Sequence, residues 1–99
     1  TGKGREAGMK RVRVIIQGRV QGVSFRAWTV DAASKRGLSG WVRNRRDGTV
    51  EAVFAGDDAV VDDMVKTCWQ GPPAAHVQNV TVSEASEPVS PGFVQAATV

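Results

Sequence analysis

The sequence predicts one α+β domain in which two helices cover one face of an antiparallel sheet. Three observations lead to this fold class. Strand-like and helix-like hydrophobic periods follow one another as strand, helix, strand, strand, helix, strand; each predicted helix has one apolar stripe; and an Asp-Gly turn joins the two middle strands. One sheet face can bury both stripes, and the resulting architecture is a ferredoxin-like βαββαβ sandwich.

The first strand is predicted over residues 11–17, where basic and apolar side chains alternate. Its two faces differ, with Val12, Val14 and Ile16 on one and Arg11, Arg13 and Ile15 on the other. The strand is expected to end at Gly18. A helix is predicted from Ser24, a favoured N-cap residue, to Gly37. Its inward stripe consists of Phe25, Trp28, Ala32 and, less regularly, Ala33.

The next two strands form a predicted hairpin. Residues 38–45 and 50–55 are its strands, and the Asp-Gly pair within residues 46–49 supplies the turn. The returning strand also has two faces, with Val50, Ala52 and Phe54 on one and Glu51 and Val53 on the other. Asn44 is expected near a strand end, where an asparagine often caps a turn.

The second helix is predicted to begin at Asp57 and Asp58, which can cap it, and to end at the Gly-Pro-Pro of residues 71–73. Its stripe follows the i, i+3, i+4, i+7 rule through Val61, Met64, Val65 and Cys68. Cys68 is therefore expected to be a buried packing residue. Residues 76–83 alternate as a strand, and residues 93–96 form a short last strand.

The segment between the first strand and the first helix has the features of an anion-binding loop. Gly18 and Gly22 permit backbone conformations that aim several N–H groups inward, and the helix start adds its own unpaired donors. Arg26 lies in the first helical turn, from which its guanidinium can hold two oxygens of a phosphate at once. The predicted phosphate-binding residues are Gln17, Gly18, Arg19, Val20, Gln21, Gly22, Val23 and Arg26.

This loop differs from the loops of nucleotide-binding proteins and of phosphatases that act through a cysteine. It lacks the Gly-Lys-Ser/Thr ending of the common phosphate loop and the three closely spaced glycines of the dinucleotide fingerprint. Val20 stands six residues before Arg26, where a cysteine nucleophile would be expected. Ser24 has no histidine or lysine near it in the sequence, so it is interpreted as a helix cap.

Two motifs resemble those of the acylphosphatase family: Gly-Arg-Val-Gln-Gly-Val-Ser-Phe-Arg over residues 18–26, and Gly-Trp-Val-Arg-Asn-Arg-Arg-Asp-Gly-Thr-Val-Glu over residues 40–51. The resemblance covers most of the chain in motif order and spacing. It implies that Arg26 binds the phosphoryl group of the substrate and that Asn44 orients the attacking water. The chain departs from the family pattern at residues 93–96, which lack a basic and aromatic ending.

The resemblance implies an enzyme that hydrolyses small-molecule acyl phosphates without a metal or a cofactor, with inorganic phosphate as product and competitive inhibitor. A carboxylate leaves without being protonated, because its conjugate acid has a pKa of about 4 to 5, so no general acid is required. No metal site is expected. His76 is the only histidine, and the aspartates at positions 57, 58, 62 and 63 have the spacing of a helix cap and a solvated helix face.

The net charge of +3 leaves another class of function open. Ferredoxin-like sheets also bind single-stranded RNA, so a non-catalytic domain that binds RNA or another anionic partner is the alternative. The aromatic Lys/Arg-Gly-Phe run of RNA-recognition motifs is missing, which disfavours nucleic acid. The arginines are expected instead around the loop, where they could steer an anionic substrate, with solvated strand faces as the alternative position for several of them: Arg11, Arg13, Arg19, Arg26, Arg43, Arg45 and Arg46.

The sequence also yields expectations about organisation and location. Residues 1–8 are expected to be a disordered tail or a remnant of expression, and residues 9–99 the domain. Neither a membrane-spanning apolar run nor a secretory signal is recognisable, so a cytoplasmic location is expected. A domain of this size without an obvious extra apolar face is expected to be a monomer. Acylphosphatase-like domains also occur within larger carbamoyltransferases of hydrogenase maturation, for which this chain is expected to be too short.

Overall fold

The computed structural model describes residues 8–99 and contains every predicted element, with ends shifted by no more than two residues. The strands and helices are β1 (Met9–Arg19), α1 (Phe25–Lys35), β2 (Ser39–Asn44), β3 (Val50–Asp57), α2 (Asp58–Gln70), β4 (His76–Glu84) and β5 (Phe93–Gln95). The predicted tail lies outside the described residues except for Gly8, whose carbonyl accepts a hydrogen bond from the Asp58 N–H at 3.0 Å.

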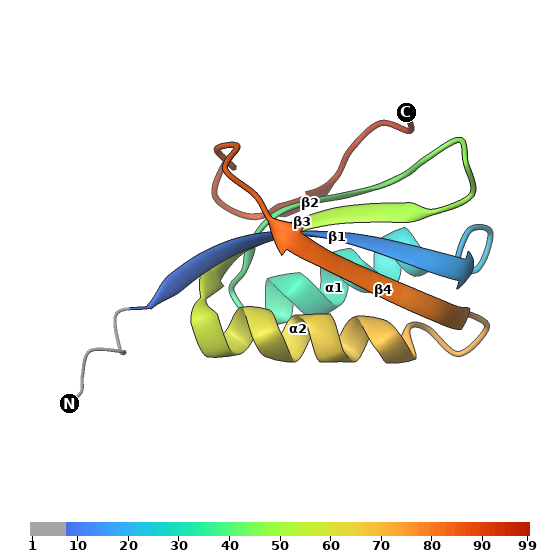
Figure 1. Ribbon diagram of the computed structural model, residues 1–99, viewed down its shortest axis with the longest axis horizontal. Helices are drawn as coiled ribbons and strands as arrows, with labels where there is room; N and C mark the ends of the chain where they lie inside the picture. Colours follow the sequence, from blue (N-terminus) through green and yellow to red (C-terminus); the bar gives the residue numbers. More distant parts are fainter. Residues whose placement is uncertain (1–7) are drawn as a thin grey trace.

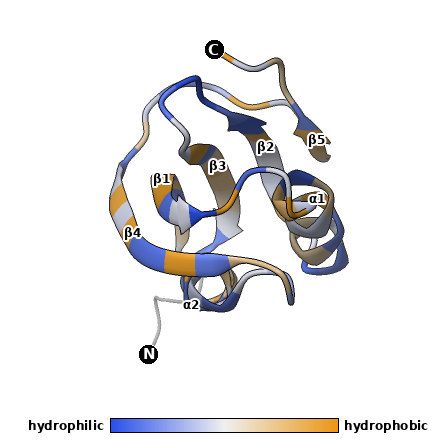
Figure 2. Ribbon diagram, turned by 90° about the vertical axis from the view of Figure 1, so that its right-hand side faces the viewer, coloured by the Kyte–Doolittle hydropathy of each residue, from blue (hydrophilic) through white to orange (hydrophobic). Residues whose placement is uncertain are grey.

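The fold class predicted from the sequence is confirmed, with one addition to the sheet. Figure 1 shows both helices on one face of the sheet, and the strand order β4-β1-β3-β2-β5 can be followed from left to right in Figure 2. Four strands are antiparallel as predicted. The short β5 pairs parallel with β2, because the chain crosses from β4 at one edge to the free side of β2 at the other. The sheet is therefore mixed.

The core lies between the sheet and the two helices, and the predicted apolar faces form it. Val14, Ile16, Phe54 and Met64 are completely buried, and the ring of Phe93 on β5 stacks on Phe54 with 5.3 Å between centroids. These contacts fix which side of each strand faces the helices. The alternation of β1, β2 and β5 therefore decides which of their other side chains lie on the helix side.

The stripe of α1 differs from its prediction at one turn. Trp28 is only half-buried and packs edge-on against Phe25, whereas the neighbouring Thr29 is completely buried. A buried threonine is tolerated here because its hydroxyl donates to the Phe25 carbonyl at 2.8 Å. A polar residue with such a local partner is difficult to recognise as a core residue from the sequence.

The second helix agrees with its prediction. The carboxylate of Asp57 accepts hydrogen bonds from the N–H groups of Ala59 and Val60, at 3.0 and 3.4 Å, and so caps the helix. Cys68 is completely buried on the inner face, and this burial raises the pKa of its thiol to about 12. The expectation of a packing cysteine is confirmed. Neither helix of residues 8–99 has the length and apolarity that a membrane crossing needs.

The sheet face opposite the helices is also partly buried, which the sequence did not predict. Val53 is completely buried and Glu51 is only 4% exposed. The Glu51 carboxylate accepts hydrogen bonds from the Nε atoms of Arg13 and Arg43, each at 2.9 Å. The Cζ atom of Arg43 also lies 4.5 Å from the centroid of the Trp41 ring. Arg13 also contacts Glu87. We call these four charged residues, Glu51, Arg13, Arg43 and Glu87, the Glu51 cluster.

The Glu51 cluster corrects the expected position of the arginines. Arg11, Arg13 and Arg43 do not surround the predicted loop, because strand alternation places them on the face turned away from the helices. The guanidinium of Arg11 donates to the Glu87 carbonyl at 2.6 Å. These three side chains are held by acceptors of the protein itself and are not positioned to steer a substrate to the loop.

Candidate active site

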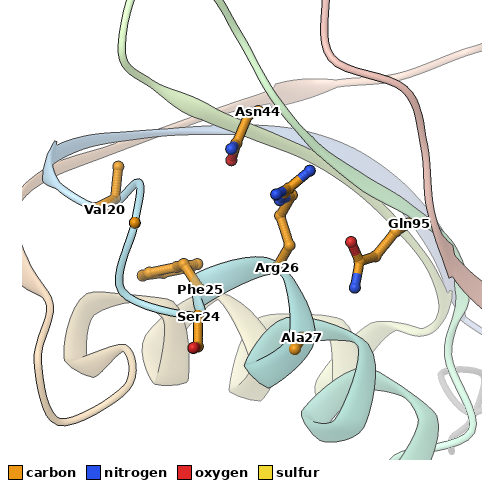
Figure 3. A pocket seen from close by; sticks show the side chains of 8 residues that line it. Val20, Ser24, Phe25, Arg26, Ala27, Asn44 and Gln95 are labelled. Carbon is orange, nitrogen blue, oxygen red and sulfur yellow. The ribbon is translucent and has the colours of Figure 1, made fainter.

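A pocket with a volume of about 290 Å³ opens where β1 leads into α1, beneath the end of β2 (Figure 3). Its lining residues are Val20, Gly22, Ser24, Phe25, Arg26, Ala27, Asn44 and Gln95. The predicted site residues Val20, Gly22, Arg26 and Asn44 therefore meet in one place, although Arg26 and Asn44 come from different elements. Of the seven arginines expected around the loop, Arg26 alone lines this pocket.

The backbone of the loop changes handedness between successive residues. Gly22 and Ser24 both have left-handed backbone angles, with φ of 73° and 64°, and Val23 between them has a negative φ. Alternating right-handed and left-handed conformations turn successive N–H groups toward one side as a nest for an anion, and the φ angles of this loop are compatible with such a nest. Glycine adopts such angles without strain, and Ser24 is the single non-glycine residue with a positive φ in the described chain.

Ser24 occupies the N-cap position, but its side chain does not cap the helix. Its carbonyl accepts the first helical hydrogen bond, from the Trp28 N–H at 3.0 Å, whereas its hydroxyl forms no capping bond. The prediction of the position is confirmed and the expected side-chain cap is wrong, because the left-handed backbone departs from the extended conformation typical of capping serines. The Ser24 side chain therefore satisfies none of the N–H groups that the first turn of a helix leaves without an intrahelical partner.

Arg26 projects from the first turn of α1 into the pocket (Figure 3). Within residues 8–99, no carboxylate forms an ion pair with its guanidinium. The side chain is half-buried, so its charge is only partly exposed to water. A planar cation at the start of a helix, without a carboxylate partner among residues 8–99, is suited to hold an anion with several oxygens.

Asn44 reaches the same space from the sheet. It is the last residue of β2 and shares the helix side with the buried Val42 two residues before it. Its carbonyl accepts a hydrogen bond from the Val99 N–H at 3.2 Å, and the Val99 carbonyl accepts one from the Arg46 N–H at 2.7 Å. The strand end that presents Asn44 is thus held from both sides, by β3 and by the segment after β5.

Gln21 connects the loop to the turn that follows Asn44. Its side-chain amide donates to the Arg45 carbonyl at 2.7 Å and to the Thr49 carbonyl at 2.8 Å. The same turn is closed by Asp47, which accepts from the N–H and the hydroxyl of Thr49, and these bonds lower the pKa of the Asp47 carboxyl. The side chain of Gln21 is therefore used to join the two halves of the site.

Other predicted phosphate-binding residues lie outside the pocket. Gln17, Gly18 and Arg19 belong to β1 and pair with β4, across a bulge between Gln17 and Gly18. Gly18 is needed there, because a Cβ atom would lie 2.2 Å from the His76 carbonyl oxygen. Val23 packs against the core. Gln21 does not line the pocket either, and a phosphate contact stays a prediction for all eight residues.

Gln95 is the pocket residue that the sequence did not reveal. It lies on β5 and pairs with Val42 in parallel register, which places it on the helix side with Arg26 and Asn44. A β-strand of three residues carries no periodic signal, and the parallel pairing joins segments about fifty residues apart. No local feature of the sequence therefore identifies Gln95 as a pocket residue.

The pocket contains an arginine and amides but no cluster of metal ligands. Across residues 8–99, His, Cys, Asp and Glu side chains form no group of three or more that could hold a metal ion. The guanidinium and the amides that line the pocket are groups able to bind an anion and to orient a neutral molecule, such as water, beside it.

Comparisons with known proteins agree with these features. The family model described as Acylphosphatase matches residues 12–94. An acylphosphatase of Rhodospirillum rubrum is 52% identical over 87 residues, which are 88% of this chain and 96% of the relative. One from Nostoc is 60% identical over 78 residues, covering 79% of this chain and 76% of the relative.

Solved structures give the same result. The structure of an acylphosphatase from Coxiella burnetii superposes with a TM-score of 0.86 at 33% identity, over 92% of this chain and 96% of that one. Full-length HypF in a phosphate- and nucleotide-bound form matches with a TM-score of 0.82 at 22% identity, over 92% of this chain but only 12% of HypF, and so shows a shared fold alone. From the family model and the close relatives, the chain belongs to the acylphosphatase family.

Proposed function

We propose that this enzyme hydrolyses acyl phosphates with Arg26 and the backbone N–H groups of residues 20–26 holding the phosphoryl group, and with Asn44 orienting the attacking water. Its family makes it an acylphosphatase, whose substrates are small-molecule acyl phosphates. The observation that best supports these residue roles is the shared pocket: Arg26 and Asn44 point into one space beside the left-handed backbone of Gly22 and Ser24 (Figure 3).

Binding of the phosphoryl group follows from the charges. Its oxygens are acceptors only, and the loop and the helix start offer N–H donors together with the partial positive charge of the helix end. Arg26 adds two parallel donors and a full charge that no carboxylate of residues 8–99 neutralises. As negative charge spreads over the equatorial oxygens in the transition state, these fixed donors stabilise it further.

Cleavage then requires a correctly placed water. The water oxygen forms a new bond to phosphorus, the bond from phosphorus to the acyl oxygen breaks, and the carboxylate leaves with the electron pair while the water proton passes to solvent or phosphate. Asn44 would hold the water in line with the breaking bond. A carboxylate needs no protonation to leave, since its conjugate acid has a pKa of about 4 to 5. We therefore propose that neither a general acid nor a metal takes part.

The test is the hydrolysis of benzoyl phosphate in excess EDTA by the wild-type chain, Arg26→Ala and Arg46→Ala. Arg46 is exposed and outside the pocket, so its variant controls for the loss of one positive charge near the site. We expect turnover that EDTA does not reduce, that Arg26→Ala abolishes and that Arg46→Ala retains, with no turnover of p-nitrophenyl phosphate. A folded wild-type chain without turnover would contradict the proposal and favour a binding domain.

The remaining expectations belong to this proposal. Inorganic phosphate should inhibit competitively, because it is the product that fits the loop. RNA is disfavoured, since the Glu51 cluster occupies the sheet face on which RNA-recognition modules present their aromatic residues. A monomeric state and a cytoplasmic location stay predictions, and light scattering of the purified chain tests the former.

A further inference from the structure

Gln95 is a polar pocket residue to which the proposed reaction gives no role. Two contacts hold its backbone in place: β5 pairs with β2 through Val42, and the Ala96 N–H donates to the Val42 carbonyl at 2.8 Å. Phe93, two residues earlier on the same strand, is buried against Phe54. Strand alternation therefore holds the side chain of Gln95 on the pocket side.

The side chain of Gln95 points from β5 toward Arg26 in Figure 3, while Val20 and the loop lie on the other side of the guanidinium. Ala27 follows Arg26 and has only a methyl group, so no bulky side chain at that position separates α1 from the Gln95 amide. The side-chain amide forms no hydrogen bond within residues 8–99, unlike that of Gln21, which uses both of its hydrogens. An acceptor oxygen is thus available beside an arginine that has no carboxylate partner in the described chain.

We propose that Gln95 is a positioning residue for Arg26. When an anion is bound, its amide oxygen accepts a hydrogen bond from the side of the guanidinium that faces away from the loop, and so holds the plane of the guanidinium toward the phosphoryl oxygens. This inference rests on the proposed function of Arg26. It deepens that function by naming what orients the arginine.

The neutrality of the amide is essential to this role. A carboxylate in the same place would form an ion pair with Arg26 and compete with the phosphate for its donors. The Glu51 cluster shows that outcome elsewhere in this protein, where one carboxylate holds Arg13 and Arg43 at 2.9 Å each. An amide can orient the arginine and leave its charge for the substrate.

The experiment compares Gln95→Glu, Gln95→Leu and Val94→Glu with the wild-type chain. Val94 is the neighbouring residue on the same strand, is 58% exposed and lies on the opposite sheet face, so its variant adds the same charge without facing Arg26. The measurements are KM and kcat for benzoyl phosphate, the inhibition constant of inorganic phosphate, and the melting temperature. Gln95 is exposed, so we expect all three variants to fold.

We expect Gln95→Glu to raise both KM and the phosphate inhibition constant about 10-fold or more, because the new carboxylate would take a charge-assisted hydrogen bond of Arg26 away from the phosphate. Gln95→Leu should raise them about 3-fold, with a smaller change in kcat, and Val94→Glu should resemble the wild-type chain. Equal constants for Gln95→Glu and Val94→Glu, in a protein that Arg26→Ala inactivates, would overturn the inference and leave the proposed function standing. A wild-type chain that neither binds phosphate nor hydrolyses benzoyl phosphate would overturn both.

Discussion

The arginines on the two faces of the sheet differ in what they contact. On the sheet face opposite the helices, which we call the far face, Arg13 and Arg43 donate to Glu51, whose side chain is only 5% exposed. On the helix side, Arg26 lies beside backbone N–H groups and amides, without a carboxylate partner in residues 8–99. The same side chain thus serves packing in one region and, in the function we propose, anion binding in the other. The presence or absence of a protein counter-charge separates the two roles better than the density of basic residues does.

The most severe test of this comparison is Arg26→Lys, which keeps the charge and removes the planar pair of donors. We expect kcat/KM to fall by about 100-fold or more, because an ammonium cannot hold two oxygens in fixed geometry. Steady-state kinetics with benzoyl phosphate measures it, and Arg43→Lys serves as the matched control on the far face. Near-normal activity of Arg26→Lys would show that charge alone is sufficient in the pocket.

Asn44→Ala tests whether the pocket has separate places for phosphate and water. Since Asn44 is assigned to the water, kcat should fall by about 100-fold while the inhibition constant of phosphate stays within about 3-fold of the wild-type value. Both constants come from the same inhibition experiment. Loss of phosphate inhibition would instead assign Asn44 to the anion itself.

Glu51→Gln tests the far face. The substitution removes the carboxylate charge that Arg13 and Arg43 share and that also lies 4.0 Å from Arg45. Because Arg13 and Arg43 are about 30% exposed, water offsets part of the loss. We expect the free energy of unfolding to decrease by about 2 kcal/mol, with kcat unchanged at temperatures where the variant is folded. Urea unfolding measures it, and the exposed Glu84→Gln should have no comparable effect. A loss of activity without a loss of stability would contradict the division between the faces.

The smallest expected effect concerns the backbone of the loop. Ser24→Gly removes the strain of a left-handed serine, and we expect it to stabilise the protein by about 0.5–1 kcal/mol after the entropic cost of glycine is included. The backbone donors stay in place, so activity should be retained. Ser34→Gly, in the regular helix α1, should destabilise by about 0.5 kcal/mol. Thermal unfolding compares the two variants, and an inactive Ser24→Gly would reopen a chemical role for the hydroxyl.

The sequence predicted most of the fold because its signals are local. Alternation defined β1 and β3, the i, i+3, i+4, i+7 stripe defined α2, and Gly71 ended that helix as expected. The two motifs likewise placed Arg26 and Asn44 at the ends of elements that meet in one pocket.

What the sequence did not reveal depends on contacts between distant segments. The parallel pairing of β5 brings Gln95 to the site, and the Glu51 cluster forms only when β1, β2 and β3 align. The misplaced arginines are a different case, since the alternation of β1 already separated Arg13 from the face that packs on the helices. Strand geometry, and not the density of basic residues, decides the face on which each arginine lies.

The two hydrogen bonds of Gln21 have a consequence for the entropy of catalysis. Its amide ties the loop to the turn behind Asn44 at two carbonyl oxygens, so the loop and the strand end cannot reorient independently. The conformational freedom of these segments is therefore lost when the chain folds and not when the substrate arrives. A small substrate with few atoms to contact has little binding energy available for ordering a site, and in this protein the folded chain supplies that order beforehand.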